Sequence, residues 1–104
     1  MYEYFDFDYN RAVFEWDEEK AASNFTKHGI RFETASKVFA DENKMIRNDD
    51  EHPWEERYQI LGKVGKILFV VCTFRRGNVV HIISARRATD PEKVRYEHGE
   101  SYNE

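Results

Sequence analysis

The chain has 104 residues with a single cysteine, and its formal net charge is −4 at pH 7. This length fits one domain with one modest core, and the longest apolar run, residues 67–73, is too short to cross a bilayer. The acidic balance argues against a general nucleic-acid binder. A lone cysteine excludes an intrachain disulfide and, with no secretory signal at the N-terminus, favours a reducing cytoplasm.

The charges are unevenly distributed along the chain. Residues 1–53 carry 7 Lys or Arg against 13 Asp or Glu, whereas residues 54–98 carry 9 against 5. A chain of this kind can present one basic face to a polyanion and acidic surface elsewhere. We therefore expect any contact with nucleic acid to be local, with positioning more important than bulk attraction.

Two helices are expected in the first half of the chain, after a short strand over residues 13–16. Asp17 is placed as the N-cap of a helix that runs to about His28, and Gly29 follows as its left-handed C-cap. Apolar spacing indicates a second, shorter helix over residues 33–39.

The second half of the chain has the pattern of an antiparallel meander. A tight hairpin at residues 76–78 joins its last two strands. The expected strands cover residues 44–48, 57–63, 67–75 and 79–87.

The order of these elements predicts the fold class and the domain boundaries. We expect an α+β domain over residues 13–98, in which two N-terminal helices pack on an antiparallel sheet meander and a C-terminal helix follows. Residues 1–12 are interpreted as an N-terminal extension, either an arm or an extra edge strand. Residues 99–104 form a polar tail.

The junction between the last strand and the last helix carries two arginines, Arg86 and Arg87. Thr89 and Glu92 have the spacing of a capping box, and Pro91 falls in the first helical turn. Two guanidinium groups beside a helix N-terminus fit an anion such as phosphate. Alternatively, these arginines only pair with acids of the same domain, and the residues alone leave both interpretations open.

The hairpin limits how the arginines of the sheet can act together. Arg75 lies at the turn end and Arg86 at the far end, so about 20 Å of strand separates them. A two-residue loop would place Phe69 opposite Arg86, and a three-residue loop would shift this register by one. In either register the two arginines reach different phosphates, which suits a polymer better than a mononucleotide.

Motifs spread over residues 13–97 give the chain a resemblance to the BrnT toxin family. They are F-E-W-D at 14–17, K-H-G at 27–29, E-R-Y at 56–58, T-F-R at 73–75 and I-I-S-A-R at 82–86. The resemblance implies a RelE-like fold and a toxin of a type II toxin–antitoxin pair, a metal-independent endoribonuclease that cuts RNA and inhibits translation. It also implies neutralisation by a BrnA-like ribbon-helix-helix antitoxin, contact with operator DNA only through that antitoxin, no membrane contact, and room for a homodimer within the complex.

Cleavage of RNA by its own 2′-OH needs a base near that oxygen, cations on the phosphate and a proton donor for the leaving oxygen. With the resemblance, the candidate catalytic residues are His28, Arg75, His81 and Arg86. The candidate RNA-binding residues are Lys20, Lys27, Arg87, Trp16 and Tyr96, the last two by stacking on a base. Glu56 is another candidate base. No metal-ligand spacing and no cofactor motif appears, so neither group is expected.

Several candidates also have a purely structural interpretation. His28 lies at a helix C-terminus, where a cation is favoured anyway, and Lys20 fits a solvated helix face. Trp16 fits the core, and Tyr96 fits a packing residue whose hydroxyl finds one partner. His81 stands where the family usually has Arg. This difference puts a phosphate-binding role of the position in question, and it adds a titratable group that Arg cannot supply. The alternative function is a non-catalytic interaction module that only docks a partner protein.

Overall fold

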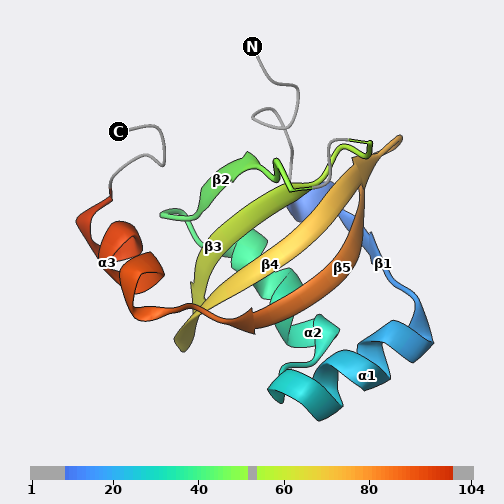
Figure 1. The fold of residues 1–104 in the computed structure, drawn as a ribbon. Coiled ribbons are helices and arrows are strands. Elements are labelled where there is room, and N and C mark those ends of the chain that lie inside the picture. The colour runs from blue at the N-terminus through green and yellow to red at the C-terminus, as the bar shows by residue number, and fades with distance from the viewer. Residues whose placement is uncertain (1–8, 52–53, 100–104) are drawn as a thin grey trace.

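The computed structural model describes residues 9–51 and 54–99, which form one five-stranded sheet with helices around it (Figure 1). The α+β prediction is confirmed, whereas residues 1–8 of the predicted extension and 100–104 of the predicted tail lie outside the described residues. Across the sheet the order is β1 (Val13–Glu15), β5 (Val79–Arg87), β4 (Lys66–Arg75), β3 (Tyr58–Val64) and β2 (Met45–Asn48). The helices are α1 (Glu18–His28), α2 (Phe32–Ala35) and α3 (Asp90–His98), with 3-10 helices η2 (Tyr9–Arg11) and η3 (Ser36–Ala40).

Two elements differ from the sequence-based expectation. The predicted second helix is α2 followed directly by η3, and the Ser36 hydroxyl donates to the Glu33 carbonyl at 2.7 Å where the helix tightens. The sheet is mixed rather than a pure antiparallel meander, because β1 pairs in parallel with β5 from Val13 opposite Val79. A three-residue strand carries too little pattern to reveal its pairing.

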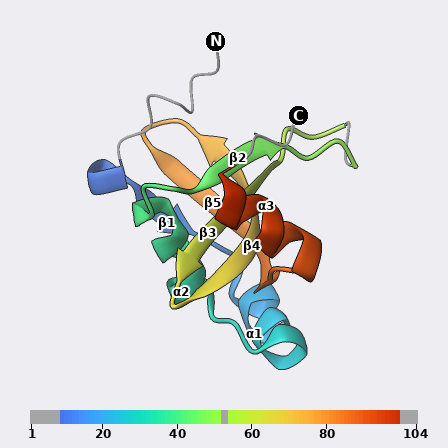
Figure 2. The same cartoon turned by 90° about the vertical axis from the view of Figure 1, so that its left-hand side faces the viewer.

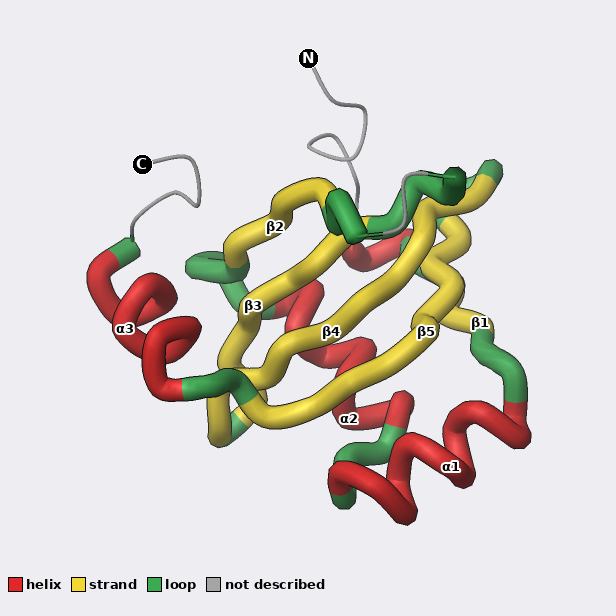
Figure 3. Tube along the Cα trace, viewed as in Figure 1, coloured by secondary structure: helices red, strands yellow, loops and turns green. Residues whose placement is uncertain are grey.

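The two faces of the sheet are covered differently. The α2–η3 segment packs on one face and lies behind the sheet in Figure 1, while α3 covers only one end of the other face, as the turned view in Figure 2 shows. The tube in Figure 3 places α1 beside the β5 edge. The α2 side holds the main core, which includes Phe32, Val38, Phe39, Ile60, Val70, Cys72 and Ile82. No helix in the described ranges has the length and apolar character needed to cross a bilayer.

At Gly62, strand β3 packs directly against η3. A Cβ atom at this position would lie 2.6 Å from the Val38 Cβ and 3.1 Å from its carbonyl oxygen. Gly62→Ala is therefore expected to lower the free energy of unfolding by about 1–3 kcal/mol, the usual cost of overpacking. Urea unfolding monitored by tryptophan fluorescence measures this change. If the midpoint and the slope of the unfolding transition stay unchanged, η3 moves aside for the added methyl group without loss of stability.

A β-bulge in β5 decides which side chains share a face. The hairpin loop has three residues, so Arg75 pairs with Val79 and Thr73 with His81. Between Val71 and Cys72 the register shifts, which leaves Ile83 without a partner residue across β4. Strict alternation would send His81 to the face opposite Ser84 and Arg86; the extra residue places all three on the face opposite α2. We call this face, with Thr73, His81, Ser84 and Arg86, the site face.

Candidate functional site

Helix α1 is fixed against β5 by a buried amide. Asp17 accepts hydrogen bonds from two amides of the first turn, and Gly29 ends the helix in the left-handed conformation. The Asn24 amide nitrogen donates to the carbonyls of Ile30, at 3.1 Å, and Ala85, at 2.9 Å. Its oxygen accepts from the Ala85 N–H at 3.1 Å. The Asn24 side chain thus supplies to β5 the two hydrogen bonds that a neighbouring strand would make.

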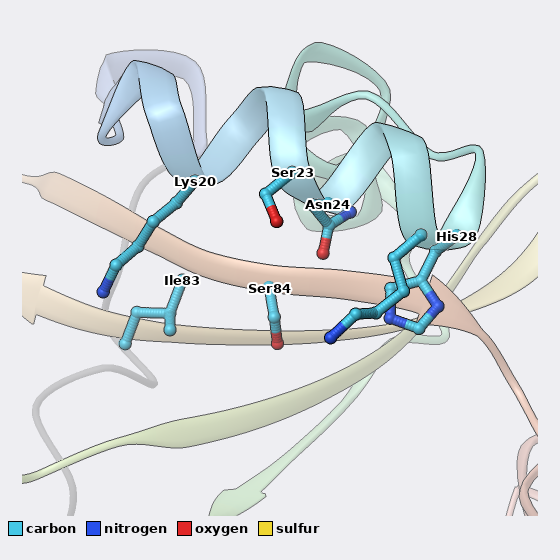
Figure 4. Close-up of a pocket in the computed structure, with 7 residues that line it drawn as sticks. Lys20, Ser23, Asn24, His28, Ile83 and Ser84 are labelled. Carbon is cyan, nitrogen blue, oxygen red and sulfur yellow. The ribbon is translucent and has the colours of Figure 1, made fainter.

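A hollow of about 220 Å³ lies between α1 and β5, and we call it the α1–β5 hollow. In Figure 4 Lys20 and His28 stand at its two ends, with Ser23 and Ser84 between them. Its full lining is Lys20, Ser23, Asn24, Lys27, His28, Ile83 and Ser84, with no carboxylate among them. Within the described part of the chain Lys20, Lys27 and His28 make no ion pair. The three groups can therefore offer their donors to an anion.

A second hollow, of about 280 Å³, lies on the site face and shares the lining residue Ser84 with the first. We call it the sheet hollow; it is lined by Asp49, Glu51, Arg57, Gln59, Phe69, Val71, Ser84 and Arg86. Its charges are balanced, because two acids accompany two arginines. Arg57 also forms a two-point pair with Glu55, at 3.1 and 3.2 Å. An anion therefore finds a stronger attraction in the α1–β5 hollow than in the sheet hollow.

Arg86 is held rigidly at the edge of the sheet hollow. Its Nη1 and Nη2 donate to the two carboxylate oxygens of Glu92 at 2.9 and 3.1 Å, and its guanidinium lies 4.0 Å from the Phe69 ring centre. Burial alone would raise the pKa of Glu92, but hydrogen bonds from Arg86 and Thr89 hold that pKa below its usual value. Nε and one Nη2 hydrogen have no acceptor among the described residues. Arg86 thus pairs with an acid of its own domain, as its structural interpretation predicts, but it still has N–H donors available to a ligand.

Glu15 joins two of the candidate residues but was not itself predicted as a site residue. Its Oε2 accepts from Arg75 Nη1 at 3.0 Å and lies 2.8 Å from His81 Nδ1. The buried hydroxyl of Thr73, directly across from His81, has no hydrogen-bond partner among the described residues. Only the parallel pairing of β1 with β5, which sets Glu15 opposite His81, could have revealed this cluster.

The structure brings some of the predicted residues together and separates others. Lys20, Lys27 and His28 share the α1–β5 hollow. Arg75, His81 and Arg86 lie along the site face, each paired with a carboxylate.

Arg87 and Glu56 lie apart from both hollows. Arg87 pairs across the sheet with Leu68, a residue of the main core, and so belongs to the opposite face. Glu56 is exposed and lines neither hollow. Among the described residues no cluster of three or more His, Cys, Asp or Glu could hold a metal ion.

The two aromatic candidates have structural contacts. Trp16 packs edge-on against Phe32, with ring centres 5.9 Å apart, at the border of the main core. Tyr96 packs on a second, smaller apolar cluster on the other face of the sheet, and its hydroxyl donates to the Asp41 carboxylate. That cluster consists of Leu61, Ile67, Phe69, Val71 and Ala88. Neither Trp16 nor Tyr96 lines either hollow. The geometry therefore favours their packing interpretation over stacking on a base.

The Tyr96–Asp41 contact makes stability depend on pH. Burial raises the pKa of Asp41, but the Tyr96 hydroxyl and the amides of Asn43 and Lys63 outweigh it and hold the pKa below 3.8. The contact therefore stabilises the fold above the unfolded-state pKa and is lost as pH falls through the lower folded-state value. Burial and the Asp41 carboxylate raise the pKa of Tyr96 to about 12. The neutral phenol therefore stabilises the fold fully below pH 10, and this stabilisation is lost as the pH rises toward 12.

Tyr96→Phe is expected to lower the free energy of unfolding by about 1 kcal/mol at pH 7. The difference from the wild-type chain should shrink as the pH falls below 3.8 toward the lower folded-state pKa of Asp41, and again above pH 10. Urea unfolding of both chains at pH 3, 7 and 11 measures it. Equal stability at pH 7 would mean that the hydroxyl does not anchor α3.

Comparisons with known proteins agree on one family. The model of a family described as "Ribonuclease toxin, BrnT, of type II toxin-antitoxin system" matches residues 16–92. The solved structure of the ribonuclease toxin BrnT of Brucella abortus is similar, with 22% sequence identity and a TM-score of 0.62 over 76% of this chain and 99% of that one. At this identity the likeness establishes a common fold. No curated protein matches the chain.

Proposed function

Because the chain belongs to the BrnT family of type II toxin–antitoxin ribonuclease toxins, we propose that it is a metal-independent endoribonuclease that inhibits translation by cutting RNA. The observation that supports this most is the α1–β5 hollow. Three basic side chains line it without a carboxylate, and one of its lining residues, Ser84, also lines the sheet hollow. Two neighbouring hollows suit an extended polyanion better than a single small anion.

The chemistry assigned to the site follows from RNA itself, which carries its own nucleophile. Lys20 and Lys27 hold phosphate groups in the α1–β5 hollow, and Arg86 offers its remaining donors from the sheet side. His28 and His81 are the candidates for proton transfer. The 2′-oxygen attacks phosphorus and the 5′-oxygen leaves, so no external nucleophile or metal-bound water is needed.

The second part of the proposal concerns partners. A type II toxin has a protein antitoxin. We propose that the partner is a BrnA-like ribbon-helix-helix antitoxin that covers the basic surface around Lys20 and Lys27. The complex would contact operator DNA only through the antitoxin. The toxin could form a homodimer within that complex. The cytoplasm, where translation takes place, is the proposed site of action.

Cleavage of an end-labelled in vitro transcript by the purified chain tests the enzymatic proposal. We expect fragments that end in a 2′,3′-cyclic phosphate and a 5′-hydroxyl, at a rate unchanged by a metal chelator. Cleavage that stops with the chelator would contradict metal independence. A transcript that stays intact under all conditions, with no growth defect in cells that express the chain alone, would contradict the ribonuclease function.

The carboxylate partners of three candidate residues favour a second function for the same surface. Arg75, His81 and Arg86 are each engaged within the fold, as a purely structural role requires. The chain would then be a non-catalytic module that only docks a partner. In that case a Lys20→Ala and Lys27→Ala double variant loses antitoxin binding, while the wild-type chain leaves RNA uncut.

A further inference from the structure

Glu15 contacts two of the candidate catalytic residues, Arg75 and His81, at once. Its carboxylate oxygen Oε2 accepts a hydrogen bond from Arg75 Nη1 at 3.0 Å. The same oxygen lies 2.8 Å from His81 Nδ1. The three side chains come from different strands, β1, β4 and β5, which the parallel β1–β5 pairing and the hairpin bring together. The His81 side chain is 25% exposed, so its ring is held but still reachable.

The contact determines which imidazole nitrogen is available. An ionised carboxylate can only accept, so Nδ1 of His81 carries the hydrogen and Nε2 of the neutral ring keeps its lone pair. Nε2 makes no hydrogen bond within the described part of the chain. Arg75 donates to the same carboxylate oxygen and so helps to hold the Glu15 side chain beside His81.

We propose that Glu15 is a positioning residue that holds His81 as the Nδ1–H tautomer, so that Nε2 takes the proton of the attacking 2′-OH. This inference rests on the proposed ribonuclease function. The 2′-oxygen forms a bond to phosphorus, its proton passes to Nε2, the bond from phosphorus to the 5′-oxygen breaks, and that oxygen takes a proton from water. The protonated ring is stabilised by Glu15 and later returns its proton to solvent.

The position of His81 relative to the two hollows supports this role. The bulge at Ile83 places His81 on the same face as Ser84, which lines both hollows. Two residues, one of them the bulged Ile83, separate them, and their partners on β4 are two positions apart, which is about 7 Å. An RNA strand that occupies the hollows and continues along β5 therefore passes over the His81 ring.

The Glu15 contacts contribute little to stability, which makes the inference testable by substitution. The Arg75 and Glu15 side chains are 56% and 43% exposed, and pairs this exposed contribute little to folding. Glu15→Gln keeps the size of the side chain and removes its charge, so this variant is expected to fold. Glu33→Gln is a matched control, because Glu33 is an exposed acid on α2, on the other side of the sheet.

The first experiment reads the tautomer directly and needs no RNA. Long-range ¹H–¹⁵N spectra of the histidine rings, recorded where the rings are neutral, should show His81 as the Nδ1–H form in the wild type and in Glu33→Gln. In Glu15→Gln we expect a mixture or the Nε2–H form. A wild-type ring in the Nε2–H form would overturn the inference, whatever the chain does to RNA.

The second experiment separates kcat from KM with the end-labelled transcript. Glu15→Gln and His81→Asn are each expected to lower kcat about 100-fold with little change in KM. The double variant should be no slower than His81→Asn alone, because Glu15 acts through His81. Asn keeps a donor near the Nδ1 position but has nothing at Nε2, so it isolates the proton-accepting nitrogen.

The outcomes distinguish this inference from the proposed function. If the wild-type chain cleaves RNA and Glu15→Gln cleaves it equally fast, the positioning role is wrong. Faster cleavage or tighter RNA binding by Glu15→Gln would also overturn it, since Glu15 would then compete with phosphate for Arg75 and His81. If the wild-type chain does not cleave at all, the proposed function fails, and the proton-transfer role of His81 falls with it, whatever its tautomer.

Discussion

Arg86→Ala is expected to lower the free energy of unfolding by about 2 kcal/mol, less than the loss of a fully buried ion pair, because the Arg86 side chain is 34% exposed. The reason is that Glu92, which is 8% exposed, would lose both guanidinium bonds and keep only its contacts to Thr89. The same change removes the donors that Arg86 offers to the sheet hollow, so RNA cleavage should also fall. Urea unfolding and cleavage rates per folded molecule measure the two effects.

Glu92→Gln is the control that separates the two roles of Arg86. It removes the carboxylate that holds Arg86 but leaves the guanidinium in place, so stability should fall while cleavage per folded molecule is largely kept. Arg86→Lys keeps the charge and loses the two-point geometry, and we expect an intermediate result. If Arg86→Ala and Glu92→Gln lower stability and leave cleavage per folded molecule equally unchanged, Arg86 only anchors α3.

Removal of both α1 lysines, in a Lys20→Ala and Lys27→Ala double variant, is expected to weaken RNA binding about 100-fold, about ten-fold for each lysine. The slope of log affinity against log salt should become shallower by about 1.4, because each phosphate contact to a single strand contributes about 0.7. Both side chains are exposed at the hollow and make no ion pair among the described residues, so stability should change little. Fluorescence anisotropy with a labelled transcript at several salt concentrations measures affinity and slope together.

The matched control is a Lys37→Ala and Lys66→Ala double variant. It removes the same charge from η3 and from the start of β4, and neither residue lines a hollow. RNA affinity should fall far less than in the α1 variant. Equal losses in the two double variants would mean that RNA responds to overall charge rather than to the α1–β5 hollow.

The parts of the fold that local chemistry determines could be predicted from the sequence. The Asp17 cap and the Gly29 stop of α1 appear as expected, and so does the Thr89–Glu92 capping box of α3. Each rests on hydrogen bonds between residues a few positions apart, which a single sequence displays. The antiparallel order of β2 to β5 was predictable for a similar reason, because short turns join β3, β4 and β5.

The arrangement of the site depends on long-range geometry that no local pattern contains. The bulge at Ile83 decides that His81 shares a face with Ser84 and Arg86, and alternation alone gives the opposite answer. The parallel pairing of β1 brings Glu15 to His81 across 66 positions of sequence. A candidate list drawn from residue types therefore included His81 but could not include the carboxylate that holds it.

The roles of arginine and tyrosine side chains were ambiguous in the sequence for a physical reason. A guanidinium beside a helix start fits a phosphate and a buried glutamate equally well, and in the fold Arg86 binds Glu92 and still has donors left over. Tyr96 has an aromatic ring and one hydroxyl, and the Asp41 carboxylate accepts the hydrogen bond from that hydroxyl. Only the packing around each group determines which of its functions remains available to a ligand.

The central claim is that RNA lies across the α1–β5 hollow and continues over the site face. Titration of the ¹⁵N-labelled chain with a short 2′-O-methyl oligonucleotide, which cannot be cleaved by 2′-OH attack, tests it most directly. We expect the largest shifts of amide signals at Lys20, Ser23, Ser84 and His81, with little change on η3. Shifts that gather on η3 and α2, or a chain that cleaves RNA while these four signals stay unmoved, would contradict the claim.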